Sequence, residues 1–174
     1  IAAAEGKKIP DVIANDLAVL FCGINPGLYS GATRHHFARP GNRFWKVLHQ
    51  AGFTSRLLTP FDEDELVASR IGITNLVERA TATAAELRPE ELRAGARRLA
   101  RKAERRRPAI VAILGIEAYR HAFERKTAQL GEQEQRLGPA RVWVLPNPSG
   151  LNAHYQLPDL VRVFGELARA AKLA

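Results

Sequence analysis

The sequence predicts one α/β domain of three layers, in which a parallel sheet of about four strands carries helices on both faces. Four short apolar runs indicate the strands, and helical stretches separate them. Continuous apolar runs of this kind are typical of strands buried on both faces of a parallel sheet. The expected strands span residues 17–25, 71–77, 109–115 and 142–147.

Helices are expected in the connections between these strands. The longest begins with Pro89, and proline is tolerated in a first helical turn. One buried stripe follows its helical spacing, made of Leu92, Ala96, Leu99 and Ala103. Its many arginines are interpreted as a solvent-exposed helix face rather than as a DNA-binding surface. The expected helices span residues 42–51, 63–69, 89–106, 117–126 and 157–172. Residues 28–41 show no periodic pattern and are expected to form a long loop.

Length and cysteine content set the domain organisation. The 174 residues suffice for one domain, expected at 9–174 after a flexible N-terminal tail at 1–8. The single cysteine, Cys22, falls inside the first expected strand, so we interpret it as a packing residue and expect no intrachain disulfide. No stretch is apolar enough to predict a membrane span. A cytoplasmic location is the expectation.

The charge of the chain favours an anionic partner. Lysine and arginine number 26 against 18 acidic residues, which gives a formal net charge of +8. A field of that sign speeds encounter with a polyanion such as nucleic acid. Many basic enzymes instead bind small anions, so charge alone leaves both classes of partner open.

Several chemistries lack their sequence patterns. The chain has neither a phosphate-binding Gly-rich loop ending in Lys-Ser/Thr nor a Gly-x-Gly-x-x-Gly after the first strand. No Cys/His spacing suits zinc, and the adjacent His35 and His36 would point to opposite sides of an extended chain. We therefore expect no cofactor and no metal.

Three asparagines stand at the carboxyl ends of expected strands: Asn25, Asn75 and Asn147. Loops at these ends line the ligand crevice of an α/β sheet, so the three side chains are expected to converge. An amide accepts and donates hydrogen bonds, and can therefore orient a water or read a base edge. It is no strong general base. Such a site suits a reaction whose leaving group departs early and whose nucleophile mainly needs positioning.

Five sequence blocks carry a resemblance to a known family. They are Ile9-Pro10-Asp11-Val12-Ile13, Gly23-Ile24-Asn25-Pro26-Gly27-Leu28, His35-His36-Phe37 with Pro40-Gly41-Asn42-Arg43-Phe44-Trp45-Lys46, Gly72-Ile73-Thr74-Asn75-Leu76-Val77-Glu78-Arg79, and Asn147-Pro148-Ser149-Gly150-Leu151. In this order they resemble the mismatch-specific uracil-DNA glycosylases, the bacterial relatives of the thymine-DNA glycosylases. The likeness covers residues 9 to about 170.

The resemblance implies a role for each matching position. Asn25 would position the hydrolytic water, and Phe37 would stack on a base flipped out of the duplex. The other positions implied at the base are Ile24, Gly27, Ser30, His36, Asn75 and Asn147. The loop implied to enter the DNA helix consists of Ser149, Gly150, Leu151 and Asn152. Leu151 would fill the gap that the base leaves.

The same resemblance implies the reaction and its partner. A monomeric, monofunctional glycosylase without lyase activity would remove uracil opposite guanine from double-stranded DNA, with thymine and etheno-cytosine as further candidate bases. Two departures bear on this range: Ala153 stands where some bacterial relatives carry arginine, and His35-His36-Phe37 is closer to the thymine glycosylases.

Two alternative functions and three other catalytic candidates stay open. The alternatives are a hydrolase of free nucleosides or nucleotides, and a non-catalytic binder of mismatched DNA. Sugar hydrolases usually employ two carboxylates. Glu78 is expected instead to be a structural partner of Arg79 or of a backbone amide, and Asp62 and Asp64 to be helix-cap residues. These three would be the next catalytic candidates if Asn25 proved dispensable.

Overall fold

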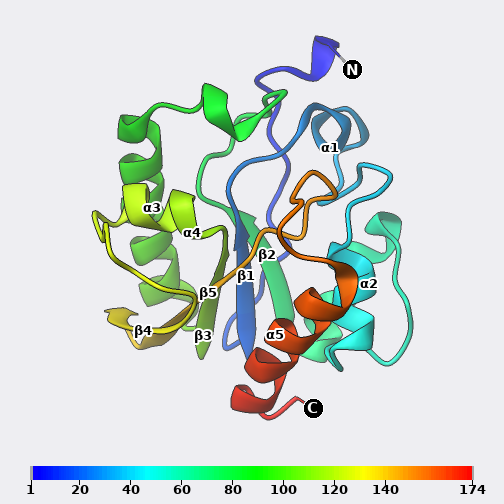
Figure 1. Ribbon diagram of the computed structural model, residues 1–174, viewed down its shortest axis with the longest axis vertical. Coiled ribbons are helices and arrows are strands. Elements are labelled where there is room, and N and C mark those ends of the chain that lie inside the picture. The colour runs from blue at the N-terminus through cyan, green and yellow to red at the C-terminus, as the bar shows by residue number, and fades with distance from the viewer. Residues whose placement is uncertain (1, 174) are drawn as a thin grey trace.

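A five-stranded sheet forms the middle layer of the computed structural model, which describes residues 2–173 (Figure 1). Its strands lie in the order β2–β1–β3–β5–β4. Their bounds are β1 Val19–Gly23, β2 Ile71–Asn75, β3 Ile110–Leu114, β4 Gly131–Leu137 and β5 Ala140–Leu145. The first four in that order are mutually parallel, while β4 runs antiparallel to β5. The predicted α/β class is confirmed.

Helices cover both faces of this sheet (Figure 1). On one face lie α2 (Phe44–Gln50) and α5 (Leu157–Ala170), and on the other α3 (Pro89–Arg106) and α4 (Ile116–Ala122). A short helix, α1 (Leu28–Thr33), follows the carboxyl end of β1. Three segments form 3₁₀ turns: Ala2–Ala4, Pro60–Ser69 and Ala84–Glu86.

Each face of the sheet has its own hydrophobic core. On the α2 and α5 side, the ring of Phe21 in β1 packs against those of Phe44, Phe53 and Phe164. On the other side, α3 buries the predicted stripe of Leu92, Ala96, Leu99 and Ala103. The two cores hold β1 rigidly between them, and the residues that follow β1 inherit that fixed position.

The expected count of four strands is wrong by one. Strand β4 at the sheet edge reads Gly-Glu-Gln-Glu-Gln-Arg-Leu, and most of its residues alternate between partly buried and exposed. An edge strand needs no apolar residues on its solvent face, and charged side chains there discourage pairing with other chains. Because this segment contains no apolar run, the sequence provided no strand signal for it.

Two helical expectations also need correction. The segment 28–41, expected to be a loop, begins with α1; this helix of six residues is too short to show a periodic pattern. The expected helix at 63–69 belongs to the longer 3₁₀ segment Pro60–Ser69, which starts with a capping box between Thr59 and Asp62. The expected helices at 42–51, 117–126 and 157–172 shorten by a few residues to α2, α4 and α5.

The segment expected as an N-terminal tail, 1–8, contacts the domain within its described part. Ala4 is buried, the Gly6 N–H donates to the Ala80 carbonyl, and the Ala80 N–H donates to the Lys7 carbonyl. Residue 1 of this segment and residue 174 lie outside the described residues. These hydrogen bonds tie the segment to the loop that leaves β2.

Cys22 is buried in the centre of the sheet, and this burial raises the pKa of its thiol. Only the thiolate reacts with disulfide reagents, and it must be reached by them. We expect an aromatic disulfide reagent to label Cys22 in the native protein no faster than the chain unfolds, and quickly in denaturant. A small free thiol is the reference compound. Labelling of the native protein at the rate of that compound would contradict the packing interpretation.

Candidate active site

The strand order creates a crevice at the carboxyl ends of β1 and β3. The chain leaving β1 returns to the sheet as β2 on one side, whereas the chain leaving β3 goes to the other side, where it forms the edge strand β4 and then β5 beside β3. Connections diverge at such a point and leave a space for a ligand. At this end of the sheet α1 and the loop after β5, which is orange, lie close together (Figure 1).

A cavity of about 610 Å³ occupies this crevice. The three strand-end asparagines all line it, so their predicted convergence is confirmed. The other expected base-binding residues that line it are Ile24, Gly27, Ser30, His36 and Phe37. From the expected intercalating loop, Ser149, Leu151 and Asn152 line the same cavity, whereas Gly150 lines a smaller pocket beside it.

Asn25 is held by its amide nitrogen. Its Nδ2 donates to the carbonyl oxygen of Arg79 at 3.0 Å and to Oγ1 of Thr81 at 2.7 Å. Thr81 is 1% exposed, and its hydroxyl donates in turn to the Thr83 carbonyl. With both amide hydrogens engaged, the Oδ1 of Asn25 is the atom that can accept a hydrogen bond from a water in the cavity.

The loop that carries these acceptors is braced from the outside. The guanidinium of Arg79 donates to both carboxylate oxygens of Glu91 on α3. Hydrogen bonds from Arg79, followed by the one from the Arg88 backbone N–H, lower the pKa of Glu91 to about 2. Glu91 therefore stays ionised and paired above that pH, which fixes the peptide whose carbonyl orients Asn25.

His36 and Asn75 form a second polar group in the cavity wall. The Nε2 of His36 lies 2.8 Å from the carbonyl oxygen of Pro10, which can only accept, so Nε2 carries a proton. Nδ1 then faces the amide nitrogen of Asn75 at 3.5 Å. Gly23 allows this arrangement, because a Cβ there would lie 2.6 Å from the Asn75 Oδ1. The Asn75 side chain thus has a defined orientation before any ligand arrives.

Phe37 presents an aromatic ring at the cavity wall. Its backbone takes a left-handed conformation (φ 51°), an uncommon choice for a non-glycine residue. The next N–H, that of Ala38, donates to Oγ of Ser30, which lies in α1 rather than in a loop as expected. The ring stacks on Phe44 at a centroid distance of 4.1 Å. This support holds Phe37 in place as a stacking surface.

The loop after β5 is organised by its own side chains. Asn147 accepts the Ser149 N–H through Oδ1, and Ser149 accepts the Leu151 N–H through Oγ. Asn152 closes the turn by donating from Nδ2 to the Asn147 carbonyl. The Asn147 Oδ1 thus already accepts one hydrogen bond from its own loop, and the amide nitrogen can donate to a ligand.

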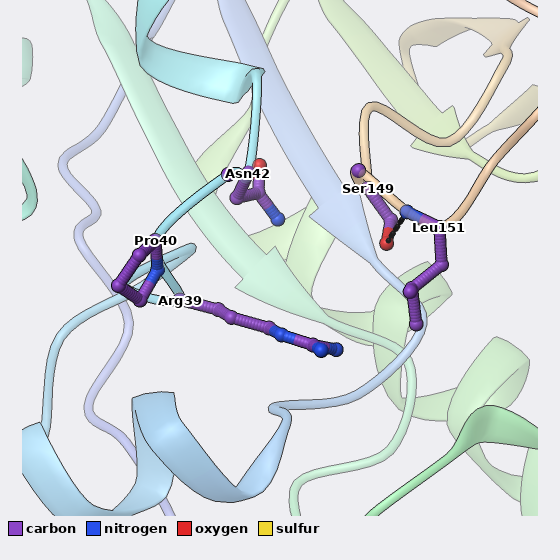
Figure 2. Close-up of a pocket in the computed structure, with 7 residues that line it drawn as sticks. Arg39, Pro40, Asn42, Ser149 and Leu151 are labelled. Atoms are coloured by element: carbon purple, nitrogen blue, oxygen red, sulfur yellow. Dashed lines mark hydrogen bonds between the residues drawn. The ribbon is translucent and has the colours of Figure 1, made fainter.

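Leu151 stands at the rim of the cavity with 69% of its surface exposed. A leucine so exposed gains little from folding, and its backbone is fixed by the Ser149 hydroxyl. Beside it, Gly150 lies against the segment before α2: a Cβ at Gly150 would come 2.7 Å from the Gly41 carbonyl oxygen. The tip of the loop therefore presents an apolar side chain on a rigid backbone (Figure 2).

Arg43 ties this loop to the start of α2. Its guanidinium donates to the carbonyls of Pro148, Ser149, Asn152 and Tyr155, and its own N–H also donates to Pro148. One side chain thus satisfies four carbonyls of a segment that has no regular secondary structure.

We expect Arg43→Met to destabilise the protein by about 1–3 kcal/mol, because the freed carbonyls lose charge-assisted partners. The loss should appear as a lower melting temperature together with faster proteolysis within 148–155. The same substitution at the exposed Arg105 is the control. An unchanged cleavage pattern in Arg43→Met would show that the loop is ordered by other contacts.

Comparison with known proteins now identifies the family. The sequence profile of the Uracil DNA glycosylase superfamily matches residues 10–168, nearly the whole chain. The chain belongs to the uracil DNA glycosylase superfamily. Its members are DNA glycosylases, which hydrolyse the N-glycosidic bond of a base.

A solved structure agrees with this assignment at the level of the fold. A candidate uracil DNA glycosylase from Methanosarcina acetivorans, determined in solution by NMR, superimposes with a TM-score of 0.61 at 18% sequence identity. The match covers 93% of this chain and 98% of that one. The two proteins therefore share a single α/β fold over nearly all of both chains.

The acidic residues considered from the sequence lie outside the cavity of this superfamily member. Glu78 is exposed and pairs with Lys8 at 3.2 Å rather than with Arg79 or a backbone amide, which corrects that expectation. Asp62 forms the capping box with Thr59, as expected, while Asp64 is exposed and makes no such contact. Within residues 2–173 the cavity lining contains no aspartate and no glutamate.

A different carboxylate, Glu63, supports the cavity indirectly. It is buried and accepts from the ring of His35 at 2.9 Å and from the backbone N–H of His36 at 3.3 Å. This contact could not be predicted from the sequence, because Glu63 and His35 lie 28 positions apart. In the described part of the chain, no group of three His, Cys, Asp or Glu side chains could hold a metal ion, and no helix is long and apolar enough to cross a membrane.

The cavity lining also includes residues that the sequence patterns did not single out, among them Thr81, Tyr29 and Arg39. Thr81 follows the β2 strand end, so its place after Asn75 was an available signal. Tyr29 and Arg39 lie in the segment interpreted as an irregular loop; Tyr29 belongs to α1, and Arg39 lies between α1 and α2. Among the described residues that line the cavity, Arg39 is the one member of the Asp, Glu, Lys and Arg types.

Proposed function

We propose that this superfamily member is a mismatch-specific uracil-DNA glycosylase. It would flip uracil opposite guanine out of duplex DNA and hydrolyse its N-glycosidic bond, leaving an abasic site. The observation that carries the proposal is a cavity whose wall holds three asparagine side chains, without a carboxylate in its described lining, beside an exposed leucine. Extrusion costs a few kcal/mol and is cheapest for a mismatched pair.

An amide-lined site suits the dissociative route to base loss. The bond between C1′ and N1 of uracil breaks with its electron pair going to the base, and the sugar becomes oxocarbenium-like. Water then bonds to C1′ and gives up a proton to solvent or to the departing base. Because the sugar is already strongly electrophilic, the water needs orientation more than deprotonation, and the Oδ1 of Asn25 provides the acceptor.

The base itself would be bound by stacking and by hydrogen-bond donors. Phe37 would stack on the pyrimidine ring, while the backbone N–H groups around Ile24 and Gly27 and the amides of Asn75 and Asn147 would face its edge. Donors aimed at the carbonyl oxygens stabilise the uracil anion as charge develops on it. Ser30 and His36, which hold the surrounding wall, would tune whether thymine or etheno-cytosine also fits.

The proposal includes hydrolysis without strand cleavage. A glycosylase with lyase activity uses an amine to form a Schiff base with the sugar. The described cavity lining contains no lysine, so the pocket offers water as the nucleophile. A monomeric state and a cytoplasmic location stay predictions of the sequence.

Base excision can be tested directly. The protein would be incubated with a labelled duplex carrying one G·U pair and then treated with hot alkali, which cuts abasic sites. We expect cleavage after alkali and none before it. Duplexes with A·U, G·T and G·C pairs, single-stranded uracil DNA and free deoxyuridine complete the set.

Each alternative function has its own outcome in this set. Hydrolysis of free deoxyuridine without excision from DNA would make the protein a nucleoside hydrolase. Tight, selective binding of the G·U duplex without any excision would make it a mismatch binder. Leu151 favours the duplex, because a free nucleotide leaves no gap to fill.

A further inference from the structure

Three polar side chains from distant parts of the chain meet beside β2, outside the cavity. Asp11 precedes β1, Thr74 lies in β2, and Lys102 lies in α3 on the face of the sheet opposite α2 and α5 (Figure 1). These three residues, which we call the clasp, are not among those that line the cavity. We propose that the clasp positions His36 and Asn75 for the flipped base, with Lys102 as its central residue. The inference rests on the proposed function, because that function assigns His36 and Asn75 to the base.

The clasp is a closed ring of hydrogen bonds around one charge pair. The Nζ of Lys102 donates to Oδ2 of Asp11 at 2.5 Å and to Oγ1 of Thr74 at 2.9 Å. The Thr74 hydroxyl donates in turn to Oδ1 of Asp11 at 2.9 Å. Only 19% of the Lys102 side chain and 25% of the Asp11 side chain are exposed. A charge pair so enclosed is weakly screened and tolerates little misalignment, so it specifies the relative position of three segments.

At one end the clasp fixes the segment that sets the proton of His36. Two backbone hydrogen bonds of 2.9 and 2.8 Å join Val12 to Ile73 in β2. Pro10, on the other side of Asp11, offers its carbonyl oxygen to Nε2 of His36 at 2.8 Å. Holding Asp11 therefore holds this carbonyl in place, and an acceptor in that place keeps the His36 proton on Nε2.

At the other end the clasp fixes the strand position before Asn75. Thr74 is fully buried, and the Nδ2 of its neighbour Asn75 lies 3.5 Å from Nδ1 of His36. While His36 keeps its proton on Nε2, its Nδ1 is an acceptor that faces the amide nitrogen of Asn75. If the proton moved to Nδ1, the Asn75 amide would have to turn over to avoid two facing donors. A turned amide exchanges donor and acceptor at the edge of the base, so excision depends on the clasp.

The rest of the contact between α3 and the end of β2 does not need Lys102. The Arg98 guanidinium, one helical turn away, donates to the Leu76 carbonyl at 2.9 Å. Gly95 packs directly against the backbone of Leu76, where a side chain would have no room. Removing the Lys102 ammonium group should therefore disturb the cavity wall more than the packing of the helix.

The test compares Lys102→Met with the wild type in excision, in binding and in the state of His36. Methionine nearly keeps the length of the side chain and removes the ammonium group. Single-turnover excision from a G·U duplex is expected to fall about tenfold, because a hydrogen-bonding orientation at the base is lost. Binding to the same duplex with a non-hydrolysable 2′-fluoro uracil nucleotide should stay close to that of the wild type. Lys102→Arg restores the charge and should recover part of the rate.

The position of the His36 proton is a readout that a loss of stability alone does not move. The ¹⁵N resonances of an imidazole ring distinguish a protonated from an unprotonated nitrogen. They would be recorded without DNA at a pH of about 8.5, where an ordinary histidine is neutral. The wild type should carry the proton on Nε2, whereas in Lys102→Met the two resonances should move toward each other. An unchanged pattern in a variant that has lost excision would overturn the proposal.

A paired substitution separates positioning from stability. Asp11→Leu/Lys102→Met removes both charges, and replacing an enclosed ion pair by apolar side chains is often neutral for stability. We expect a melting temperature near that of the wild type together with the excision loss of Lys102→Met. Recovery of both would show that the pair serves stability alone and would overturn the proposal. If Lys102→Met fails to fold, the double variant carries the same comparison.

Arg141→Met is the matched control. Arg141 pairs with Glu132 through two hydrogen bonds of 2.8 Å and lies near the start of β5, at the opposite end of the sheet from the cavity. This variant should keep the excision rate and the His36 resonances of the wild type. Wild-type excision is measured first. Its absence overturns the proposed function, whereas wild-type excision together with an unchanged rate in Lys102→Met overturns the role of the clasp alone.

Discussion

Replacing Asn25 with alanine is expected to remove most base excision while leaving duplex binding close to that of the wild type. The Oδ1 of Asn25 is the acceptor that we assign to the hydrolytic water, and this contact matters in the transition state rather than in docking. Losing the orientation of a nucleophile costs on the order of 10²–10³-fold in rate. Single-turnover excision and electrophoretic binding would be measured on the same G·U duplex.

A conservative variant sharpens this test. In Asn25→Asp the amide nitrogen is replaced by an oxygen, which cannot donate to the Arg79 carbonyl. The side chain should therefore leave its position, and activity should fall although an acceptor is still present. Asn15→Ala changes an exposed asparagine outside the cavity and serves as the control. Near-normal excision by Asn25→Ala would transfer the catalytic role to another residue.

Thr81 offers a way to separate orientation from chemistry. Its hydroxyl receives one of the two Asn25 hydrogen bonds but is itself nearly inaccessible. A Thr81→Val variant would keep the shape of the residue and remove the acceptor, with an intermediate loss of rate and unchanged duplex affinity as the expected result.

The sequence predicted those parts of the fold that depend on local pattern. The helix at 89–106 matches α3 in both bounds, because proline, an apolar stripe and a cationic end agree over 18 residues. Strand β4 was missed because an edge strand with charged, alternating residues looks like a surface loop. The helix α1 was missed because six residues provide too few turns for a period.

The candidate site, like the fold, could be predicted only in part from the sequence. Convergence of Asn25, Asn75 and Asn147 followed from parallel topology, since carboxyl ends of strands share an edge. Their detailed orientation depends on partners far along the chain: Asn25 bonds to the Thr81 hydroxyl across 56 positions, and Arg43 reaches Ser149 across 106. No spacing in a single sequence encodes contacts of that range.

Leu151→Ala is expected to lower excision from a well-stacked duplex about tenfold, with a much smaller effect on single-stranded uracil DNA. Extrusion leaves a hole in the base stack, and an apolar side chain that fills it stabilises the open state and blocks return of the base. Moving a leucine from water into such a hole contributes about 1.5–3 kcal/mol, most of which alanine forfeits. A weakly paired mismatch should lie between the two substrates.

The exposure of Leu151 makes this prediction distinct from a loss of stability. With 69% of the residue exposed, truncation removes little packing, so the melting temperature should stay near that of the wild type. Leu57→Ala is the matched control, because Leu57 is 50% exposed and lies outside the cavity lining. That variant should excise from all three substrates at wild-type rates. An equal loss on every substrate in Leu151→Ala, accompanied by a lower melting temperature, would mean that Leu151 packs its own loop, and another group would then have to hold the duplex open.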